Sequence, residues 1–409
     1  MNNYIIKRPV MLDASIQLPA SKSICNRALI LNALSYSPYE IQNLSDCDDT
    51  EVLVKALNSN SKDFDIKAAG TAMRFLTAFL SKIVGEWTIT GTERMKNRPI
   101  KILVDALNSL GARVEYIEKE GFPPLRIFGS ALQGGEISLP GNVSSQYISA
   151  LLMIAPLMEN GLILHLEGNI ISKPYIYLTL KLMKQFGVEV IWNKNVLKVY
   201  PQEYKPIPYV VESDWSAASY WYEMMALDKA AKIQLAGLFK DSSQGDAAGA
   251  DLFRKLGVKT SFTKGGVQLG FNGNVEERLA YDFVNEPDLA QTFVVTCCMK
   301  NIPFVFTGLQ SLRIKETDRI EALKRELFKL GYVLKDRDNS QLIWDGERCQ
   351  PEEHPVIQTY EDHRMAMAFA PVALVLPEGI EIAHPEVVTK SYPHYWEDLE
   401  KVGFEIRKE

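Results

Sequence analysis

Apolar stretches that begin with a polar residue recur along this chain. Each starts with a small or acidic polar side chain and continues into apolar residues over the length of a helix. They begin near Ser21, Gly70, Ser144, Asp214, Asp288 and Asp362, at spacings of 49, 74, 70, 74 and 74 residues. A helix that is apolar nearly all round is buried rather than placed at a surface. The pattern therefore predicts six buried helices.

A second series of segments alternates with the first. These segments show the pattern of an amphipathic helix that ends at a glycine and is followed by a strand-like run. The glycines are Gly111, Gly187, Gly257, Gly331 and Gly403, at spacings of 76, 70, 74 and 72 residues. A glycine at this point is typical of a left-handed helix C-cap. Both series indicate a repeating unit of about 72 residues.

The repeat predicts the domain organisation. Each unit has the order strands, buried helix, strand, amphipathic helix, strands, which is an α/β pattern. Six copies in two clusters of three would make two similar domains. The alternative is a generic α/β chain in which the spacings coincide.

Composition excludes several classes of protein. The chain has 409 residues, 46% of them hydrophobic, and a net charge of −6, so it can bury large cores but is a poor candidate for binding nucleic acid or a membrane surface. It has no apolar run long enough to span a bilayer. The N-terminal segment lacks the order of a signal peptide, so we expect a cytoplasmic protein.

Cysteine and histidine usage argues against a metal. The five cysteines are sparse and show no CxxC pair, which fits a reducing compartment rather than a zinc site or a disulfide framework. The five histidines show no HExxH spacing. We expect no metal and no cofactor.

The polar starts of the buried helices are candidate anion sites. The free N–H groups and the positive dipole end of a helix attract anions. Three of the starts carry Ser, Gly or Thr and could receive a phosphate. The other three carry Asp, which could cap its own helix or act as a catalytic carboxylate.

Charged clusters supply further candidates. Lys22 and Arg27 lie five residues apart at a helix start, and Arg98 ends a basic cluster before Pro99, expected at a helix start. A capped surface turn with a solvated lysine explains Lys22 and Arg27 about as well, and a solvated charge run is the usual explanation for a cluster such as that at Arg98. Arg364 precedes a buried stretch, where it needs an anionic partner. Lys390 alone is a weak candidate.

One further cluster alternates in charge. Asp318 and Glu321 fit a capping box, so Asp318 has a structural role. Lys315, Glu316 and Arg319 remain as candidates for ligand contact, with a surface salt-bridge network as the alternative.

A set of motifs resembles one family. The motifs are LPASKSICNRALIL, AAGTAMRFL, RMKNRPI, VSSQYISALLM, SKPYIYLTL, DWSAASY, SQGD, EPDLAQT, RIKETDRI, DHRMAMAF and TKSYP, in this order. Together they resemble the 3-phosphoshikimate 1-carboxyvinyltransferases, or 5-enolpyruvylshikimate-3-phosphate synthases, from about residue 18 to the C-terminus.

The resemblance implies a fold and a reaction. It implies two similar domains of three βαβαββ units each, an inside-out α/β barrel of the enolpyruvyl transferase type, with the active site in the cleft between them. We expect residues 1–19 and 213–409 to form one domain and residues 20–212 the other. The family transfers the enolpyruvyl group of phosphoenolpyruvate to the 5-hydroxyl of 3-phosphoshikimate in aromatic amino-acid biosynthesis, without a cofactor. We expect a monomer.

The resemblance also implies site residues. The groups expected to hold 3-phosphoshikimate are Lys22, Ser23, Arg27, Ser144, Ser145, Gln146, Ser172 and Lys315. Those expected around phosphoenolpyruvate are Lys22, Gly70, Thr71, Arg98, Arg319, Arg364 and Lys390. Asp288 is the candidate base for the 5-hydroxyl, and Glu316 is the candidate for proton transfer at the methylene carbon, with Lys22 as a possible acid.

Departures from the family pattern leave alternatives open. The main departures are Ala68, Phe75, Tyr177 and Ser311. A related enolpyruvyl transferase that acts on a UDP-sugar uses a loop cysteine, and no cysteine here lies in a comparable loop beside Arg98. A non-catalytic anion-binding homologue is a third reading, but the presence of Asp288 and Glu316 argues against it.

Overall fold

The computed structural model describes residues 3–409; Met1 and Asn2, which the sequence assigns to the first segment of the discontinuous domain, lie outside them. The chain divides into two compact units. The discontinuous unit contains the chain up to Pro19 together with Glu212–Glu409, and the inserted unit contains Ala20–Val211. No helix within residues 3–409 is long and apolar enough to cross a membrane.

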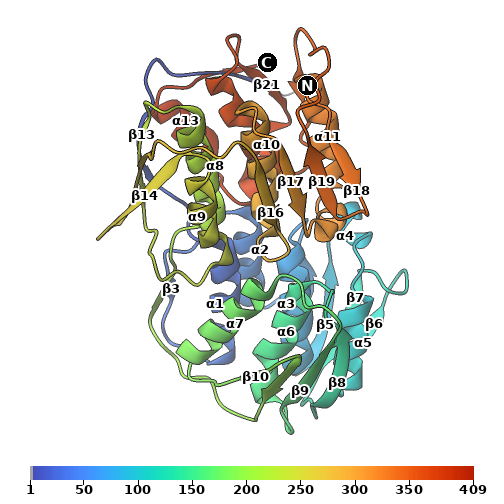
Figure 1. Ribbon diagram of the computed structural model, residues 1–409. Coiled ribbons are helices and arrows are strands. Elements are labelled where there is room, and N and C mark those ends of the chain that lie inside the picture. The colour runs from blue at the N-terminus through green and yellow to red at the C-terminus, as the bar shows by residue number, and fades with distance from the viewer. Residues whose placement is uncertain (1–2) are drawn as a thin grey trace. The chain divides into compact units, whose positions relative to one another are not determined.

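Three buried helices form the centre of the discontinuous unit. They are α8 (Trp215–Leu227), α10 (Ala290–Met299) and α12 (His363–Phe369), which η5 (Ala370–Leu374) continues. Helices α8 and α10 lie side by side (Figure 1), and both α10 with α12 and α8 with η5 are in contact. Because nearly every residue of these helices is buried, their apolar side chains form one core with the surrounding sheets.

Three four-stranded sheets surround these helices, and all have one topology. In the first sheet the order of hydrogen-bonded strands is β14 (Val258–Thr263), β15 (Gly266–Phe271), β13 (Lys232–Ala236) and β2 (Asp13–Gln17). In the second sheet the order is β16 (Leu279–Asp282), β17 (Phe304–Thr307), β19 (Gln341–Trp344) and β18 (Lys335–Arg337). In the third sheet it is β20 (Val356–Ile357), β21 (Ile380–Ala383), β1 (Asn3–Lys7) and β22 (Glu405–Lys408). In the sheets next to α10 and α12, the strand before the buried helix pairs in parallel with the strand after it. In the third sheet, β13 after α8 pairs in parallel with β2, which precedes the inserted unit in the chain. An antiparallel pair completes each sheet.

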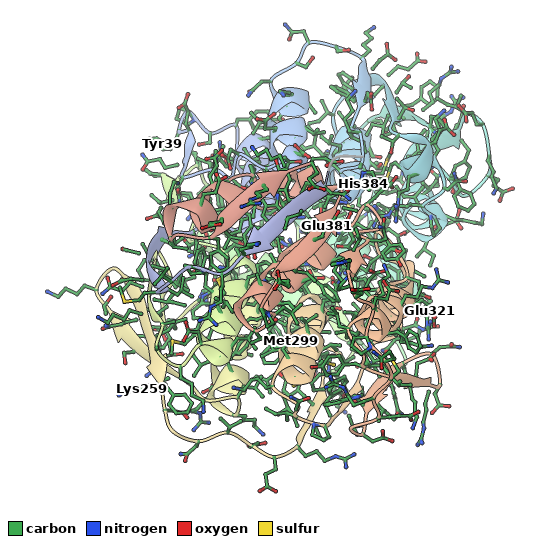
Figure 2. The ribbon with its side chains drawn as sticks, turned by 90° about the horizontal axis from the view of Figure 1, so that it is seen from above. Tyr39, Lys259, Met299, Glu321, Glu381 and His384 are labelled. Atoms are coloured by element: carbon green, nitrogen blue, oxygen red, sulfur yellow. The ribbon has the colours of Figure 1, made fainter. Side chains whose placement is uncertain are left out.

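Strand β1 comes from the opposite end of the sequence to its neighbours. It pairs with β21 and β22, and the Asn3 side-chain amide donates to Glu381 of β21 (labelled in Figure 2) at 2.7 Å. The sheet that contains the two strands flanking α12 therefore includes a strand from far away in the chain, since Asn3 and Glu381 are 378 positions apart.

Outer helices cover the sheets of the discontinuous unit and end as the sequence predicts. They are α9 (Gly249–Arg254), α11 (Arg319–Lys329) and α13 (Tyr395–Lys401). The glycines that follow them, Gly257, Gly331 and Gly403, have φ of 99°, 88° and 95°. Because residues with a Cβ rarely adopt these angles, glycine is required where the chain reverses.

The inserted unit repeats this arrangement. Its buried helices α1 (Lys22–Leu34), α3 (Gly70–Lys82) and α6 (Ser145–Ile154) contact one another, and its outer helices are α2 (Asp48–Leu57), α5 (Lys101–Ser109) and α7 (Lys173–Gln185). Its sheets run β4 (Asp63–Asp65), β5 (Gly85–Thr90), β7 (Leu125–Gly129), β6 (Arg113–Tyr116); β10 (Ile191–Asn193), β11 (Val196–Val199), β9 (Leu162–Glu167), β8 (Gly135–Pro140); and β12 (Tyr209–Val210), β3 (Ile41–Gln42).

The first repeat of the inserted unit is abbreviated. Its sheet contains only the parallel pair β12 and β3, and only residues 58–62 separate the end of α2 from β4. The antiparallel pair that completes each of the other sheets is therefore missing here. This difference from the expected βαβαββ unit explains why the first spacing in the sequence is 49 residues rather than about 72.

Two fully buried glutamates in the discontinuous unit differ in their surroundings. Neither carboxyl oxygen of Glu223, in α8, has a hydrogen-bond partner within residues 3–409, and burial raises the pKa of Glu223 well above its ordinary value of 4.5. The nearby Thr296 hydroxyl acts to lower the pKa of Glu223, but this hydroxyl donates its hydrogen bond to the carbonyl of Thr292 at 2.7 Å. Glu326, by contrast, accepts from Lys329 at 2.6 Å and from the backbone N–H of Gln358 at 2.9 Å.

We expect Glu223→Met to stabilise the protein. An unsatisfied buried carboxyl costs about 1–3 kcal/mol, and methionine has a similar volume without that cost. Because the folded-state pKa of Glu223 is raised, the wild-type chain loses stability as pH rises above the ordinary value of 4.5, so the gain should be larger at pH 8 than at pH 5.

The matched control is Glu326→Met, which should lower the free energy of unfolding by about 1.5–3 kcal/mol because it removes charge-assisted hydrogen bonds. Denaturant unfolding at both pH values measures the two effects. A loss of stability in Glu223→Met equal to that in Glu326→Met would contradict the expectation.

Candidate functional site

The three aspartates at the starts of buried helices in the discontinuous unit do not play the same part. Asp214 caps α8 by accepting from the backbone N–H of Ser216 at 2.8 Å, and Asp362 caps α12 by accepting from that of Arg364 at 2.9 Å. Asp288 lies in the short 3₁₀ turn η3 (Pro287–Leu289) before α10, and the N-cap positions of these two helices are Glu286 and Leu289. The Asp288 carboxylate instead faces cationic side chains.

Arg319 connects the candidate residues of this unit. Its side chain is 1% exposed, and its guanidinium donates to Asp362 at 2.7 Å, to Asp288 at 3.1 Å and to Glu316 at 2.9 Å. A guanidinium without partners could not be buried in this way, because the cost of desolvation would be too large. The carboxylates raise the pKa of Arg319, although burial alone would lower it.

Three further cations approach the same carboxylates. Arg364 Nη2 lies 3.0 Å from Asp288 Oδ2, and Lys315 Nζ lies 3.5 Å from Asp288 Oδ1. Lys390 Nζ lies 3.0 Å from Glu316 Oε1. These side chains come from η3, from the segment between the 3₁₀ turn η4 (Gln310–Ile314) and the start of α11, from the start of α12, and from the 3₁₀ turn η6 (Pro385–Lys390). Together they form what we name the Asp288 cluster: Asp288, Lys315, Glu316, Arg319, Asp362, Arg364 and Lys390.

The charges of this cluster determine the protonation of Asp288. Burial alone would raise its pKa, but Arg364, Lys315 and Arg319 outweigh burial and hold the pKa of Asp288 well below its usual range. Asp288 is therefore ionised in this structure. A base of such low pKa accepts a proton poorly until some of the surrounding positive charge is neutralised.

Asp246 is a carboxyl of this region that the sequence analysis did not single out, although it lies in the SQGD motif. It is buried in the 3₁₀ turn η2 (Gly245–Ala248), and one oxygen accepts from the Ser216 hydroxyl while Oδ1 has no partner within residues 3–409. Burial, together with the charge of Asp288, raises the pKa of Asp246 to about 7. The sequence indicates Asp246 only as the single acidic residue of the SQGD motif.

The inserted unit holds a second group of candidates at the start of α3. The side chain of Arg98 lies against Gly70: a Cβ on Gly70 would stand 2.5 Å from Arg98 Nη1 and 2.8 Å from Arg74 Nη1. Arg74 donates to the carbonyl of Gly70 at 2.8 Å. Within residues 3–409 no acidic side chain pairs with Arg98, which is only half-buried. A helix start beside a cation without a counter-ion is a suitable place for an anion.

A residue of α6 contacts this group, and α7 packs against α6. The Gln146 amide donates to the Thr71 hydroxyl at 3.0 Å, which fixes the start of α6 to the start of α3. Ser144 caps α6 through the backbone N–H of Gln146, and Ser145 is the first residue of that helix. Ser172 precedes α7 in the left-handed conformation, with φ of 54°.

Lys22 and Arg27 are both at the start of α1, but they are bound differently. Lys22 Nζ lies 3.3 Å from Asp49 in the first turn of α2, and the lysine side chain remains 17% exposed. Arg27 is 2% exposed, and its guanidinium donates to Thr179 at 2.7 Å, to Ser149 at 3.2 Å and to the carbonyl of Ser23 at 2.9 Å.

In this structure Arg27 therefore joins three helices, and most of its five N–H groups are already used. Its partners Ser149 and Thr179, which bond to each other at 2.8 Å, were absent from the sequence-based set. The expected role of Arg27 in ligand binding stays a prediction.

The departures from the family pattern have structural explanations at two positions. Phe75 lies under Arg27, with the guanidinium carbon 5.3 Å from the ring centroid. Tyr177 is exposed and packs against Trp192, with the ring centroids 4.5 Å apart and the rings tilted by 35°. Ala68 is exposed before α3 and Ser311 lies in η4; nothing in the structure explains either substitution.

Two local expectations are changed by the structure. Asp318 caps α11 by accepting from the backbone N–H of Glu321, as the capping box predicts, but the Glu321 side chain faces Arg313 and Lys324 instead. Pro99 does not open α5, because Ile100 is the N-cap; the carbonyl of Pro99 accepts from the Tyr147 hydroxyl at 2.6 Å.

We expect Arg319→Met to destabilise the protein by about 3–5 kcal/mol, because it leaves buried carboxylates without their common partner. Arg313→Met is the matched control: Arg313 also contacts three carboxylates, Asp318, Glu321 and Asp336, but their side chains are 25–37% exposed. That variant should lose only about 1 kcal/mol. Thermal unfolding of both variants measures the difference, and equal losses would contradict the structural role of Arg319.

Comparison with known proteins identifies the family. The family model of EPSP synthase (3-phosphoshikimate 1-carboxyvinyltransferase) matches residues 6–63 and 54–399. A 3-phosphoshikimate 1-carboxyvinyltransferase of Bacteroides fragilis is 61% identical over 405 residues, which cover 99% of this chain and 98% of that protein. The protein of the same name from Sulfurovum sp. is 36% identical over 433 residues, covering 98% of this chain and all of that one.

Solved structures agree with the fold. The structure of EPSP synthase from Acinetobacter baumannii matches with a TM-score of 0.80 and 18% identity, over 99% of each chain. At that identity the likeness concerns the fold, and it confirms the predicted α/β architecture. Since the family model covers most of the sequence and full-length relatives reach 61% identity, this chain belongs to the EPSP synthase (3-phosphoshikimate 1-carboxyvinyltransferase) family.

Proposed function

We propose that this chain transfers the enolpyruvyl group of phosphoenolpyruvate to the 5-hydroxyl of 3-phosphoshikimate and releases phosphate. The observation that carries the proposal is the environment of Asp288. Its carboxylate lies just before a buried helix and within 3.5 Å of three cations, Arg364, Arg319 and Lys315. A carboxylate held among three cations is suited to chemistry beside bound anions.

Phosphoenolpyruvate carries a carboxylate and a phosphate, and planar guanidinium groups bind both well. Arg364, Lys390 and Arg98 are the cations proposed to hold it, with Arg319 orienting the first two through Asp288 and Glu316. Gly70 leaves room for the Arg98 side chain beside the first turn of α3. Thr71 and Gln146 complete that surface through their mutual hydrogen bond.

3-Phosphoshikimate needs a phosphate site and partners for its hydroxyls. The proposed set in the inserted unit consists of residues at helix starts: Lys22, Ser23, Ser144, Ser145 and Ser172. Hydroxyls and backbone N–H groups at such positions suit a phosphate. Lys315 is proposed to complete the set from the discontinuous unit, so both units would serve one reaction.

Binding of the two anions would also prepare Asp288 for its role. In the free protein three cations keep its pKa low. When a phosphate or carboxylate takes up the charge of Arg364 or Lys315, less positive charge acts on Asp288, so its pKa rises toward the working pH. Asp288 can then accept the proton of the 5-hydroxyl as the oxygen attacks C2 of phosphoenolpyruvate.

The methylene carbon gains a proton in the same step and loses one when the tetrahedral adduct expels phosphate. Glu316 is proposed to move this proton, with Lys22 as a possible acid. Glu316 is held between Arg319 and Lys390 at 2.9 Å and 3.0 Å, so its carboxylate is fixed in direction. The monomeric state and cytoplasmic location expected from the sequence stay predictions.

Release of phosphate tests the proposed reaction. Purified protein should release phosphate from phosphoenolpyruvate when 3-phosphoshikimate is present, and should not do so with UDP-N-acetylglucosamine. Release with the UDP-sugar alone would favour the related transferase. Release with neither, in a preparation shown to bind 3-phosphoshikimate, would favour a non-catalytic binding protein.

We expect Asp288→Ala to keep or strengthen ligand binding, because the three cations lose a competing carboxylate, while kcat falls by about 10²–10⁴. Calorimetry and initial rates measure the two quantities. Asp282→Ala is the matched control, since Asp282 lies at the end of the strand before Asp288 and, among residues 3–409, its carboxylate accepts only from the backbone N–H of Val284. Near-normal kcat in Asp288→Ala would remove Asp288 as the base.

A further inference from the structure

One face of helix α8 carries polar side chains, although the helix lies in the core. Ser216, Tyr220 and Glu223 are spaced by four and three residues, so they share a face of the helix. The Ser216 hydroxyl donates to Asp246, and the whole Tyr220 side chain is only 1% exposed. Burying a polar group without a partner is costly. The partner of the Tyr220 hydroxyl is therefore informative.

Tyr220 contacts an arginine that is proposed to hold phosphoenolpyruvate. Its hydroxyl accepts a hydrogen bond from Arg364 Nη1 at 3.4 Å. The other terminal nitrogen of the same guanidinium, Nη2, lies 3.0 Å from Asp288. The backbone N–H of Arg364 is fixed as well, since it donates to Asp362 at 2.9 Å. The guanidinium is thus held at both of its terminal nitrogens.

The two partners of this guanidinium differ in charge. Asp288 is ionised, because the cations around it hold its pKa well below the usual range. Burial raises the pKa of Tyr220 to about 12, against the opposing effect of Arg364, so the phenol is neutral near pH 7. A neutral acceptor fixes the direction of a guanidinium without cancelling its charge. When a bound anion replaces Asp288 as the partner of Arg364, Tyr220 can stay in place.

The Tyr220 ring is itself fixed by its neighbours. It lies edge-on to the ring of Tyr395, with the centroids 6.0 Å apart and an interplanar angle of 65°. The Tyr395 hydroxyl donates at 3.0 Å to the carbonyl of Met367, which belongs to the same helix α12 as Arg364. A displacement of the Tyr220 hydroxyl would therefore disturb the packing of α8 against α12 and α13.

We propose that Tyr220 is a positioning residue that aims the guanidinium of Arg364 at phosphoenolpyruvate. It acts through Arg364 rather than by contact with a substrate. The inference rests on the proposed function, in which Arg364 holds that anion. A guanidinium binds a carboxylate or phosphate through two parallel hydrogen bonds, so a small rotation of its plane weakens binding. Loss of the Tyr220 hydroxyl would permit that rotation.

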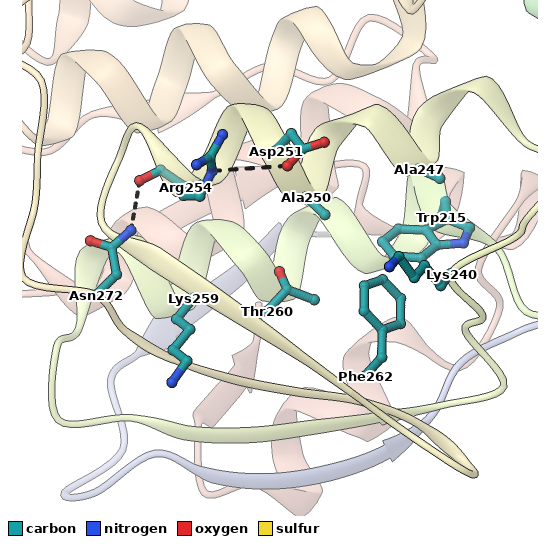
Figure 3. Close-up of a pocket in the computed structure, with 10 residues that line it drawn as sticks. All are labelled: Trp215, Lys240, Ala247, Ala250, Asp251, Arg254, Lys259, Thr260, Phe262 and Asn272. Atoms are coloured by element: carbon teal, nitrogen blue, oxygen red, sulfur yellow. Dashed lines mark hydrogen bonds and ion pairs between the residues drawn. The ribbon is translucent and has the colours of Figure 1, made fainter.

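Tyr222 offers a matched control on the same helix. It is also 1% exposed, and its hydroxyl bonds to that of Thr260 at 3.0 Å. Residues two positions apart on a helix do not face each other, so Tyr222 points away from Tyr220. Thr260 lines a cavity of about 360 Å³ whose lining includes no member of the Asp288 cluster (Figure 3). Tyr222→Phe therefore removes a buried hydroxyl of the same kind without touching Arg364.

The test compares Tyr220→Phe with Tyr222→Phe. Saturation-transfer NMR without 3-phosphoshikimate measures binding of phosphoenolpyruvate where no reaction can occur. Tyr220→Phe should raise its dissociation constant about three- to tenfold, and Tyr222→Phe should leave it unchanged. In initial-rate measurements, Tyr220→Phe should raise the KM for phosphoenolpyruvate by a similar factor, while kcat and the KM for 3-phosphoshikimate stay within about twofold. A merely structural role would affect both substrates alike.

The possible outcomes separate this inference from the proposed function. In a wild-type chain that binds phosphoenolpyruvate, an unchanged dissociation constant and KM in Tyr220→Phe, or equal changes in both variants, overturn the role of Tyr220. If the wild type binds phosphoenolpyruvate but releases no phosphate, the proposed reaction fails and the dissociation constants decide the role of Tyr220. If the wild type neither binds phosphoenolpyruvate nor releases phosphate, both proposals fail.

Discussion

A helix that is buried along its length can reach polar groups only at its ends, and this constraint organises both units. The first N–H groups of such a helix need acceptors, so polar side chains collect where the buried helices begin. In the discontinuous unit Asp214 and Asp362 meet that need by capping their own helices. At the start of the third buried helix, the charge of Asp288 is balanced by the side chains of Arg364 and Arg319. Asp288 is the reactive centre of the proposed site.

Stability and chemistry share the same residues in the Asp288 cluster. Asp362 caps α12 and also binds Arg319, so one carboxylate fixes both a helix and the central cation. Arg319 in turn orients Asp288 and Glu316. The inserted unit uses its cations in a different way: Arg27 is committed to internal bonds, whereas Arg98 beside Gly70 has no acidic partner among residues 3–409.

Features that follow from a local repeating pattern can be predicted from the sequence. Contacts between residues that are distant in the sequence cannot. The starts of the buried helices and the glycine C-caps follow from local patterns, and the structure confirms them at Gly70 and Gly257 among others. The shared bonds of Arg319 could not be predicted, because its partners are up to 43 residues away and meet only in the folded unit. Asp246 was missed for the same reason, since its burial is set by packing against α8.

The position of β1 has a consequence for how the chain folds during synthesis. Its partners β21 and β22 are synthesised long after β1, at Ile380–Ala383 and Glu405–Lys408, and the partner of β2 follows only after the whole inserted unit. Residues 20–211 hold all the strands of their own sheets, so they can fold while β1 and β2 still wait unpaired. A chain whose synthesis stops before residue 405 would therefore contain one complete unit and one unit with an unpaired sheet edge. Unpaired strand edges promote aggregation and are bound by chaperones.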